Sequence, residues 1–100
     1  YSPVFVYTPE GKYKTRFGTH GNAQDQLQFP QAIALDSKNR VYIGDSGGVK
    51  VFGTDGKYVG IARMPFTGSI SGMAFDKSNR LYVVSRSEKK VYRFALNEPQ

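Results

Sequence analysis

Residues 33–44 read Ile33-Ala34-Leu35-Asp36-Ser37-Lys38-Asn39-Arg40-Val41-Tyr42-Ile43-Gly44, and 40 residues later 73–84 read Met73-Ala74-Phe75-Asp76-Lys77-Ser78-Asn79-Arg80-Leu81-Tyr82-Val83-Val84. Asp, Asn, Arg and Tyr recur identically, and nearly every apolar position is filled by another apolar residue. A period of this length, built from short β-type runs, is typical of propeller blades and other stacked β units. The repeat therefore predicts an all-β chain of stacked units.

Turn signals divide the chain into nine expected strands. The cluster 36–39 and the Asp55-Gly56 pair favour tight hairpin turns. We expect four-stranded antiparallel blades in a 2 + 4 + 3 strand count, which does not close a ring by itself. A β-sandwich is the alternative that short strands with regular turns leave open. The expected segments are the last two strands of a preceding blade (1–18), a linker (19–31), a full blade (32–63), a second linker (64–71) and three strands of the next blade (72–96).

The first copy resembles a known family. The run Phe29–Asp36, then Asn39–Ser46, Val49–Phe52 and Asp55–Tyr58 is similar to an NHL repeat, a blade type common in six-bladed propellers. The resemblance implies that this chain supplies two to three blades of such a ring. It also implies binding of proteins or RNA, while related six-bladed propellers include metal-dependent lyases and lactonases.

The second copy departs from this pattern. Ser85-Arg86 stands where the first copy has Asp45-Ser46, and the loop that follows is two residues longer. Loops on a rigid scaffold are where binding groups usually lie, so the divergent loop end is the expected working face. Its candidate partner-binding residues are His20, Asp25, Asp45, Ser46, Arg63, Phe66, Arg86, Lys89 and Lys90.

Composition narrows the function classes. The 14 Lys and Arg against 8 Asp and Glu give a net charge of +6, which favours acidic partners or a solvated basic surface. With no cysteine, disulfides and thiolate metal sites are excluded. No apolar run of about 18 residues and no signal-peptide pattern occurs, so we expect no membrane insertion. The compartment stays open, with a secreted, periplasmic or extracellular setting as the preferred expectation.

Signals for catalysis are weak. His20 is the only histidine, and the serines lack the strand-to-helix setting that activates a nucleophile. Neither a P-loop nor a dinucleotide fingerprint occurs. Asp45 could bind a cation or organise the end of its strand, and its place in the repeat favours the second role. We therefore expect no catalytic, cofactor or metal residues in this chain.

The sequence favours a non-catalytic binding or scaffold module of a larger NHL-repeat protein or complex. Its partner would be another protein or the remaining blades, reached through the divergent loops and the exposed blade flanks, so an oligomer or larger complex is expected. One alternative is an RNA-binding propeller that uses a basic loop face. A second alternative is a fragment of a metal-dependent propeller lyase or lactonase.

Overall fold

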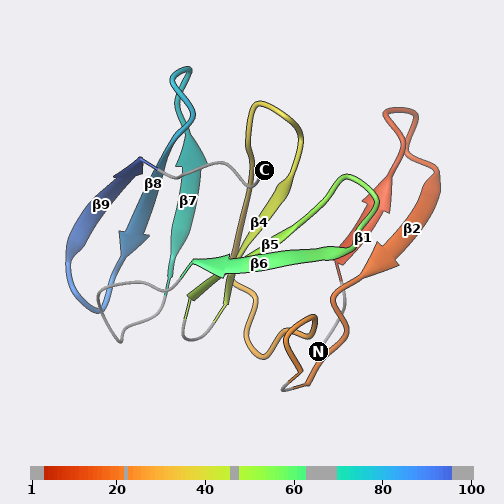
Figure 1. Ribbon diagram of the computed structural model, residues 1–100, viewed down its shortest axis with the longest axis horizontal. Coiled ribbons are helices and arrows are strands. Elements are labelled where there is room, and N and C mark those ends of the chain that lie inside the picture. The colour runs from red at the N-terminus through yellow and green to blue at the C-terminus, as the bar shows by residue number, and fades with distance from the viewer. Residues whose placement is uncertain (1–3, 22, 46–47, 63–69, 96–100) are drawn as a thin grey trace.

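The chain folds into short strands joined by turns. The computed structural model describes residues 4–21, 23–45, 48–62 and 70–95, and within these ranges there is no helix, hence none suited to crossing a membrane. Figure 1 shows how the strands are arranged. They are β1 (Val4–Tyr7), β2 (Tyr13–Phe17), β3 (Ala32–Leu35), β4 (Val41–Asp45), β5 (Gly48–Phe52), β6 (Tyr58–Ala62), β7 (Gly72–Phe75), β8 (Arg80–Ser85) and β9 (Lys90–Ala95).

The strands form three separate sheets, and within each sheet consecutive strands pair antiparallel. Sheet 1 is β1-β2, sheet 2 is β3-β4-β5-β6, and sheet 3 is β7-β8-β9. The predicted all-β class, the antiparallel pairing and the 2 + 4 + 3 strand count are confirmed. The sheets stand side by side without closing into a barrel or ring (Figure 1).

The core lies between the sheets. Tyr42 and Ile43 are adjacent on β4 and point to opposite faces, so each enters a different apolar cluster. The middle strands β4 and β5 of sheet 2 are therefore buried on both faces. The edge strand β3 is covered on only one face, and the other edge strand, β6, exposes Val59 and Ile61. The cluster between sheets 2 and 3 contains Tyr42, Val49, Val51, Ile70, Leu81 and Val83. The cluster between sheets 1 and 2 contains Leu27, Ile43 and Phe52, with Val4 and Phe17 packed against it.

The repeated Asp, Asn, Arg and Tyr build the β3–β4 turn. Asp36 Oδ1 accepts the N–H groups of Lys38 and Arg40, each at 2.9 Å. Asp36 Oδ2 accepts Arg40 Nε at 2.6 Å and the Tyr42 hydroxyl at 3.2 Å. Asn39 takes the left-handed conformation, φ 63°, that the turn requires and that Asn tolerates better than most residues. One carboxylate thus holds the turn, its arginine and the next strand together.

The second copy makes the same bonds. Asp76 accepts the N–H groups of Ser78 and Arg80, each at 2.9 Å, and also Arg80 Nε and the Tyr82 hydroxyl. Asn79 has φ 62°. The N–H of Arg80 leads the hydrogen bonds that hold the pKa of Asp76 below its usual value. Burial alone would raise the pKa of Asp36, but hydrogen bonds from Arg40 and Lys38 outweigh it and lower that pKa as well.

Gly44 is required by packing between sheets 2 and 3. A Cβ at this position would meet Ile70 Cγ2 at 2.8 Å and Ala32 Cβ at 3.3 Å. We expect Gly44→Ala to destabilise the chain by about 1–3 kcal/mol, as overpacking of a core does. Gly60→Ala is the matched control, because a Cβ there meets nothing within 4 Å. Urea unfolding of both variants measures this, and equal stabilities would contradict the packing.

The Asp36 turn makes stability depend on pH. A carboxyl whose folded pKa lies below its usual 3.8 stabilises the fold above that pH, and this contribution is lost as the pH falls further. Because the Asp36 side chain is 0% exposed and its partner Arg40 is 13% exposed, we expect Asp36→Asn to cost about 1–3 kcal/mol at neutral pH. Asp76→Asn should cost less, since that pair is more exposed. Urea unfolding at pH 7 and near pH 3 should show a smaller acid loss for Asp36→Asn than for wild type.

Candidate functional site

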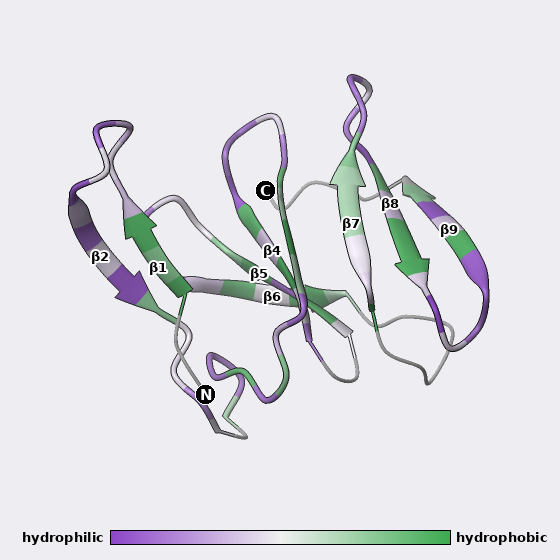
Figure 2. Ribbon diagram, turned by 180° about the vertical axis from the view of Figure 1, so that it is seen from behind, coloured by the Kyte–Doolittle hydropathy of each residue, from purple (hydrophilic) through white to green (hydrophobic). Residues whose placement is uncertain are grey.

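The repeated turns and the divergent loops occupy opposite ends of the sheets (Figure 1). The β1–β2, β3–β4 and β7–β8 turns lie at one end, and the 18–31 linker and the β8–β9 turn lie at the other. In Figure 2 the hydrophobic colour is concentrated on β1 and on the strands of sheets 2 and 3, whereas β2, parts of β9 and most turns are hydrophilic. The divergent end is therefore polar and is carried by a rigid apolar framework.

Two charged side chains of sheet 2 fix the first linker. The carboxylate of Asp45, which is buried, accepts the N–H of Gln28 at 2.9 Å and that of Phe29 at 2.5 Å. Lys50 Nζ donates to the carbonyl oxygens of Ala23 and Gln26. As a partner-binding candidate Asp45 needs correction, because its carboxylate faces the chain's own backbone rather than the surface. Its place at the end of β4 fits the strand-end role.

The other candidates on this linker are exposed. His20 forms an isolated parallel bridge with Leu27, whose side chain is buried in the cluster between sheets 1 and 2. Asp25 is exposed at the rim of a smaller cavity that sheets 1 and 2 also line. His20 and Asp25 thus lie on one linker but are not joined into a shared site by any described contact. Ser46, Arg63 and Phe66 lie outside the described residues.

The β8–β9 turn explains why the second copy diverges. Ser85, which takes the place of Asp45, is buried, and its hydroxyl meets that of Ser87 and accepts the N–H of Glu88 at 3.3 Å. Lys89 has φ 56° and donates its N–H to the carbonyl of Arg86. A hydroxyl thus stabilises the longer turn where the first copy uses a carboxylate to hold a linker. Arg86, Lys89 and Lys90 are all exposed on this turn.

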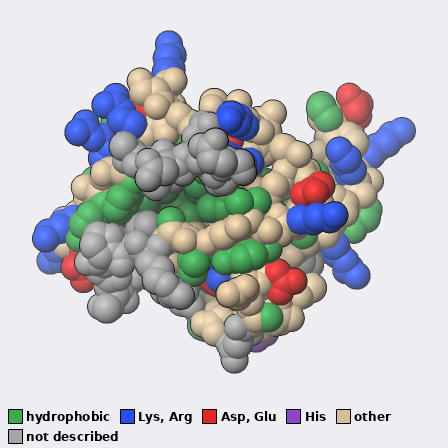
Figure 3. Space-filling model, viewed as in Figure 1, with side chains coloured by type: hydrophobic (Ala, Val, Ile, Leu, Met, Phe, Trp, Pro, Cys, Tyr) green, Lys and Arg blue, Asp and Glu red, His purple; other side chains and the backbone are tan. Residues whose placement is uncertain are grey.

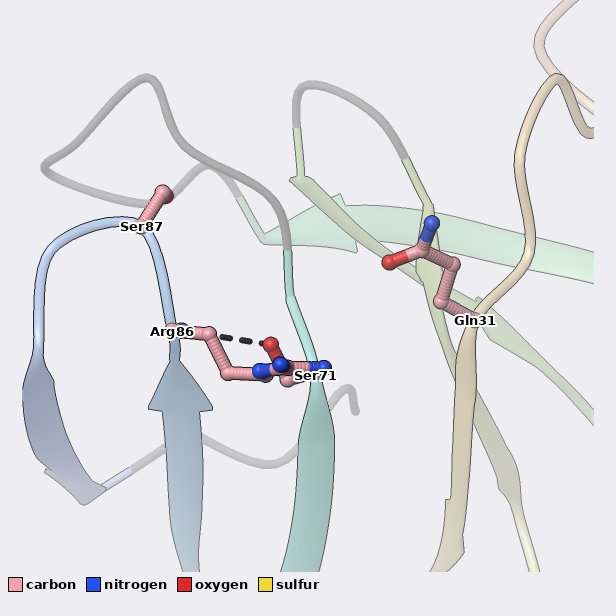
Figure 4. Close-up of a pocket in the computed structure, with 4 residues that line it drawn as sticks. All are labelled: Gln31, Ser71, Arg86 and Ser87. Carbon is pink, nitrogen blue, oxygen red and sulfur yellow. Dashed lines mark hydrogen bonds between the residues drawn. The ribbon is translucent and has the colours of Figure 1, made fainter.

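An open cavity of about 730 Å³ lies beside this turn, lined by Gln31, Ser71, Arg86 and Ser87. Gln31 and Ser71 are 40 residues apart, and each directly precedes the first strand of its sheet, β3 and β7 respectively. Figure 4 shows Arg86 beside Ser71, whose hydroxyl accepts the Arg86 N–H at 3.2 Å, and Gln31 across the opening. The arrangement offers a guanidinium, hydroxyls and an amide to a polar or anionic group. Sequence analysis found Arg86 but missed Gln31 and Ser71, which the offset of 40 residues could have paired.

The sheet faces at the two flanks of the chain are apolar and uncovered. Ile33 and Leu35 on β3 are each 54% exposed, and Val91 on β9 is 65% exposed. Figure 3 shows apolar side chains gathered over the middle of one face, with Lys and Arg projecting around its margin. Sequence analysis expected exposed flanks without naming these residues. Comparison of register positions between the two copies would have identified them.

Within the described ranges, no group of three or more His, Cys, Asp or Glu side chains comes together to hold a metal ion. The cavity beside the β8–β9 turn and the apolar flanks are the surface features of the described residues that we consider further for binding.

Comparison with known proteins places the fold. No protein-family profile matches the chain, and no curated protein matches it in sequence. Among solved structures, it is similar to selenomethionine-substituted virginiamycin B lyase from Staphylococcus aureus, with a TM-score of 0.60 and 14% identity over 95% of this chain. The chain spans about a third of that protein, 34% of its length. At this identity the likeness concerns the fold alone, and the chain has the architecture of a β-propeller segment.

Proposed function

We propose that this chain is a non-catalytic interaction and scaffold segment of an NHL-type β-propeller, and that it joins further blades or a partner protein through its apolar flanks. One comparison carries the proposal. Val49 pairs with Gly44 on β4, and Val91 pairs with Val84 at the repeat-equivalent position on β8. Val49 is 0% exposed, whereas Val91 is 65% exposed.

The difference arises from the neighbouring sheet. Sheet 3 covers the face of sheet 2 that carries Val49 and Tyr42, while no described residue covers the corresponding face of sheet 3. Tyr82, the counterpart of Tyr42, is only half-buried although its hydroxyl makes the same bond to Asp76. A sheet built to be buried on both faces exposes apolar surface when one neighbour is absent, and such surface marks interaction sites. The support is thus internal to the chain.

The NHL assignment rests on the repeat itself. The Asp, Arg and Tyr that carry the resemblance make matching hydrogen bonds in both turns, so these three are structural elements of the unit rather than parts of a binding site. Binding specificity then falls to the positions where the copies differ. These positions are the cavity at Arg86 and the open flanks.

RNA binding is the second candidate, because Arg86, Lys89 and Lys90 are exposed on one turn beside the open cavity. If RNA is the ligand, its affinity should fall steeply with salt and be lost when Arg86, Lys89 and Lys90 are all changed to Glu. Fluorescence anisotropy with labelled single-stranded RNA measures both, and an affinity insensitive to both changes removes this candidate.

A segment of a propeller lyase or lactonase is the enzymatic alternative, suggested by the name of the structurally similar protein. It would draw its metal ligands from blades other than these, since the described residues bring no such cluster together. Divalent-ion binding by the longer protein would favour it over the scaffold proposal.

The scaffold proposal predicts that the 100-residue chain self-associates. Sedimentation velocity should show association that grows with concentration, and Val91→Glu should reduce it because a charge opposes burial of that face. Thr54→Glu is the matched control, with the same charge change on an exposed turn. A monomer whose unfolding is sharp and independent of concentration would overturn the proposal.

A further inference from the structure

The repeated turn carries a hydrogen bond between neighbouring sheets. Asn79 Oδ1, in the β7–β8 turn, accepts the N–H of Ser37 in the β3–β4 turn at 3.0 Å. Ser37 directly follows the turn carboxylate Asp36, so each repeat presents this N–H at the same place. The asparagine side chain of one unit thus forms a hydrogen bond with the turn of the unit before it. This links the turn chemistry of the repeat to the packing of its sheets.

Asn39 occupies the equivalent position one unit earlier. It has the same left-handed conformation, and its N–H makes the same 3.0 Å bond to the turn carbonyl, that of Asp36, as the N–H of Asn79 makes to Asp76. Asn79 is half-buried against its neighbour, whereas Asn39 is exposed. Among the described residues, none hydrogen-bonds to the Asn39 amide. The acceptor is in place and its donor is not part of the described structure.

The apolar surface beside Asn39 is also uncovered, whereas the equivalent surface beside Asn79 is covered. Ile33 pairs with Ile43, which is buried. Ile33 and Leu35, the next residue on the same face of β3, are nevertheless each 54% exposed. Their counterparts Met73 and Phe75 pack against the cluster between sheets 2 and 3. Phe75 does so edge-on against Tyr42, at 4.7 Å between ring centroids. A partner with a tyrosine at that place would cover Leu35 in the same way.

The strand that would hold such a partner has an open edge. β5 is paired on both sides, by β4 and β6, but its counterpart β1 is paired only with β2 in the described residues. Two strands are therefore lacking beside β1, in the position that β3 and β4 occupy beside β5. An unpaired edge next to an apolar face is a template for strand addition.

We infer that the flank formed by β1, β3 and Asn39 binds a two-stranded β-hairpin of the repeat's own type, with Asn39 accepting the N–H that follows the hairpin's turn aspartate. This inference rests on the proposed function and names the partner of one flank. The second strand of the hairpin pairs with β1 as β4 pairs with β5. Its alternate residues cover Ile33 and Leu35. The equivalent contact between sheets 2 and 3, together with the pairing of β4 with β5, gives the expected geometry and register of this contact.

The chain's own hairpins do not supply this partner directly. The β3–β4 hairpin is paired with β5 and the β7–β8 hairpin with β9, so a second copy would have to unpair one of its strands first. The occupant is therefore a hairpin from outside these 100 residues that carries the Asp-x-x-Asn-Arg turn and has its second strand free to pair with β1. The experiment must therefore distinguish binding of such a hairpin from self-association of the chain through the same flank.

A labelled synthetic peptide with the sequence of residues 31–45 is the probe, titrated into the full chain and followed by fluorescence anisotropy. We expect saturable one-to-one binding that Asn39→Gly weakens about 3–10-fold, the effect of one lost hydrogen bond. Glycine keeps the left-handed turn, so this variant should unfold like wild type. Asn39→Asp keeps an acceptor and should keep the affinity. Leu35→Glu should abolish binding.

The matched control is Asn79→Gly, which removes the same amide where its donor lies within the chain. It should lower the unfolding midpoint and leave peptide affinity unchanged. A peptide with Ser37→Pro lacks the donor N–H but keeps a residue favoured at this position of the turn. This peptide should bind the wild-type chain more weakly by the same factor as the unchanged peptide binds the Asn39→Gly chain. Combining the two changes should weaken binding no further.

Each outcome bears on the inference. Peptide binding that Asn39→Gly leaves unchanged would overturn it while leaving the scaffold proposal intact. Absence of peptide binding by a chain that still self-associates would also overturn the inference and leave the scaffold proposal intact. A monomeric chain that binds no peptide would overturn both proposals.

Discussion

The structure depends on one constraint, which is that each sheet must be covered on both faces by neighbouring sheets. Sheet 2 satisfies it over its middle strands β4 and β5, with Ile43 and Phe52 against sheet 1 and Tyr42 and Val49 against sheet 3. Hydrophobic burial on both faces is what holds such stacked units together, since each unit contacts only its neighbours. Where a neighbour is lacking, the same residue types lie exposed. The interaction surfaces that we propose for this chain follow from that constraint.

Hydrogen bonds add order to this packing. The Asp36 and Asp76 carboxylates each join a turn, an arginine and a tyrosine, and the tyrosine then contributes its ring to a sheet face. Tyr42 thereby connects the turn of sheet 2 to Phe75 of sheet 3. The Ser37–Asn79 bond ties the two turns directly. Turn chemistry and sheet stacking are thus one system, repeated along the chain.

Much of the fold could be predicted from the sequence, because hairpin turns and alternating apolar residues are local signals and the 40-residue repeat relates them. The nine strands and their division into three sheets needed nothing else. The candidate site was harder to predict from the sequence, because it depends on contacts between residues that are far apart in the chain. Asp45 looked like a surface carboxylate until its bonds to Gln28 and Phe29 placed it inside the chain. The role that we propose for Asn39 could be inferred only after the structure showed that Asn79 bonds to Ser37.

The central claim is that the exposed sheet faces become buried when neighbouring units are present. The chain has no cysteine, so single-cysteine variants at Val49 and Val91 report on the two equivalent positions without background. Thiol-labelling rates should be slow at position 49 in every context. At position 91 labelling should be fast in the 100-residue chain at low concentration and slow in a longer protein or complex that supplies the neighbouring sheet. Equally fast labelling at position 91 in both contexts would contradict the account.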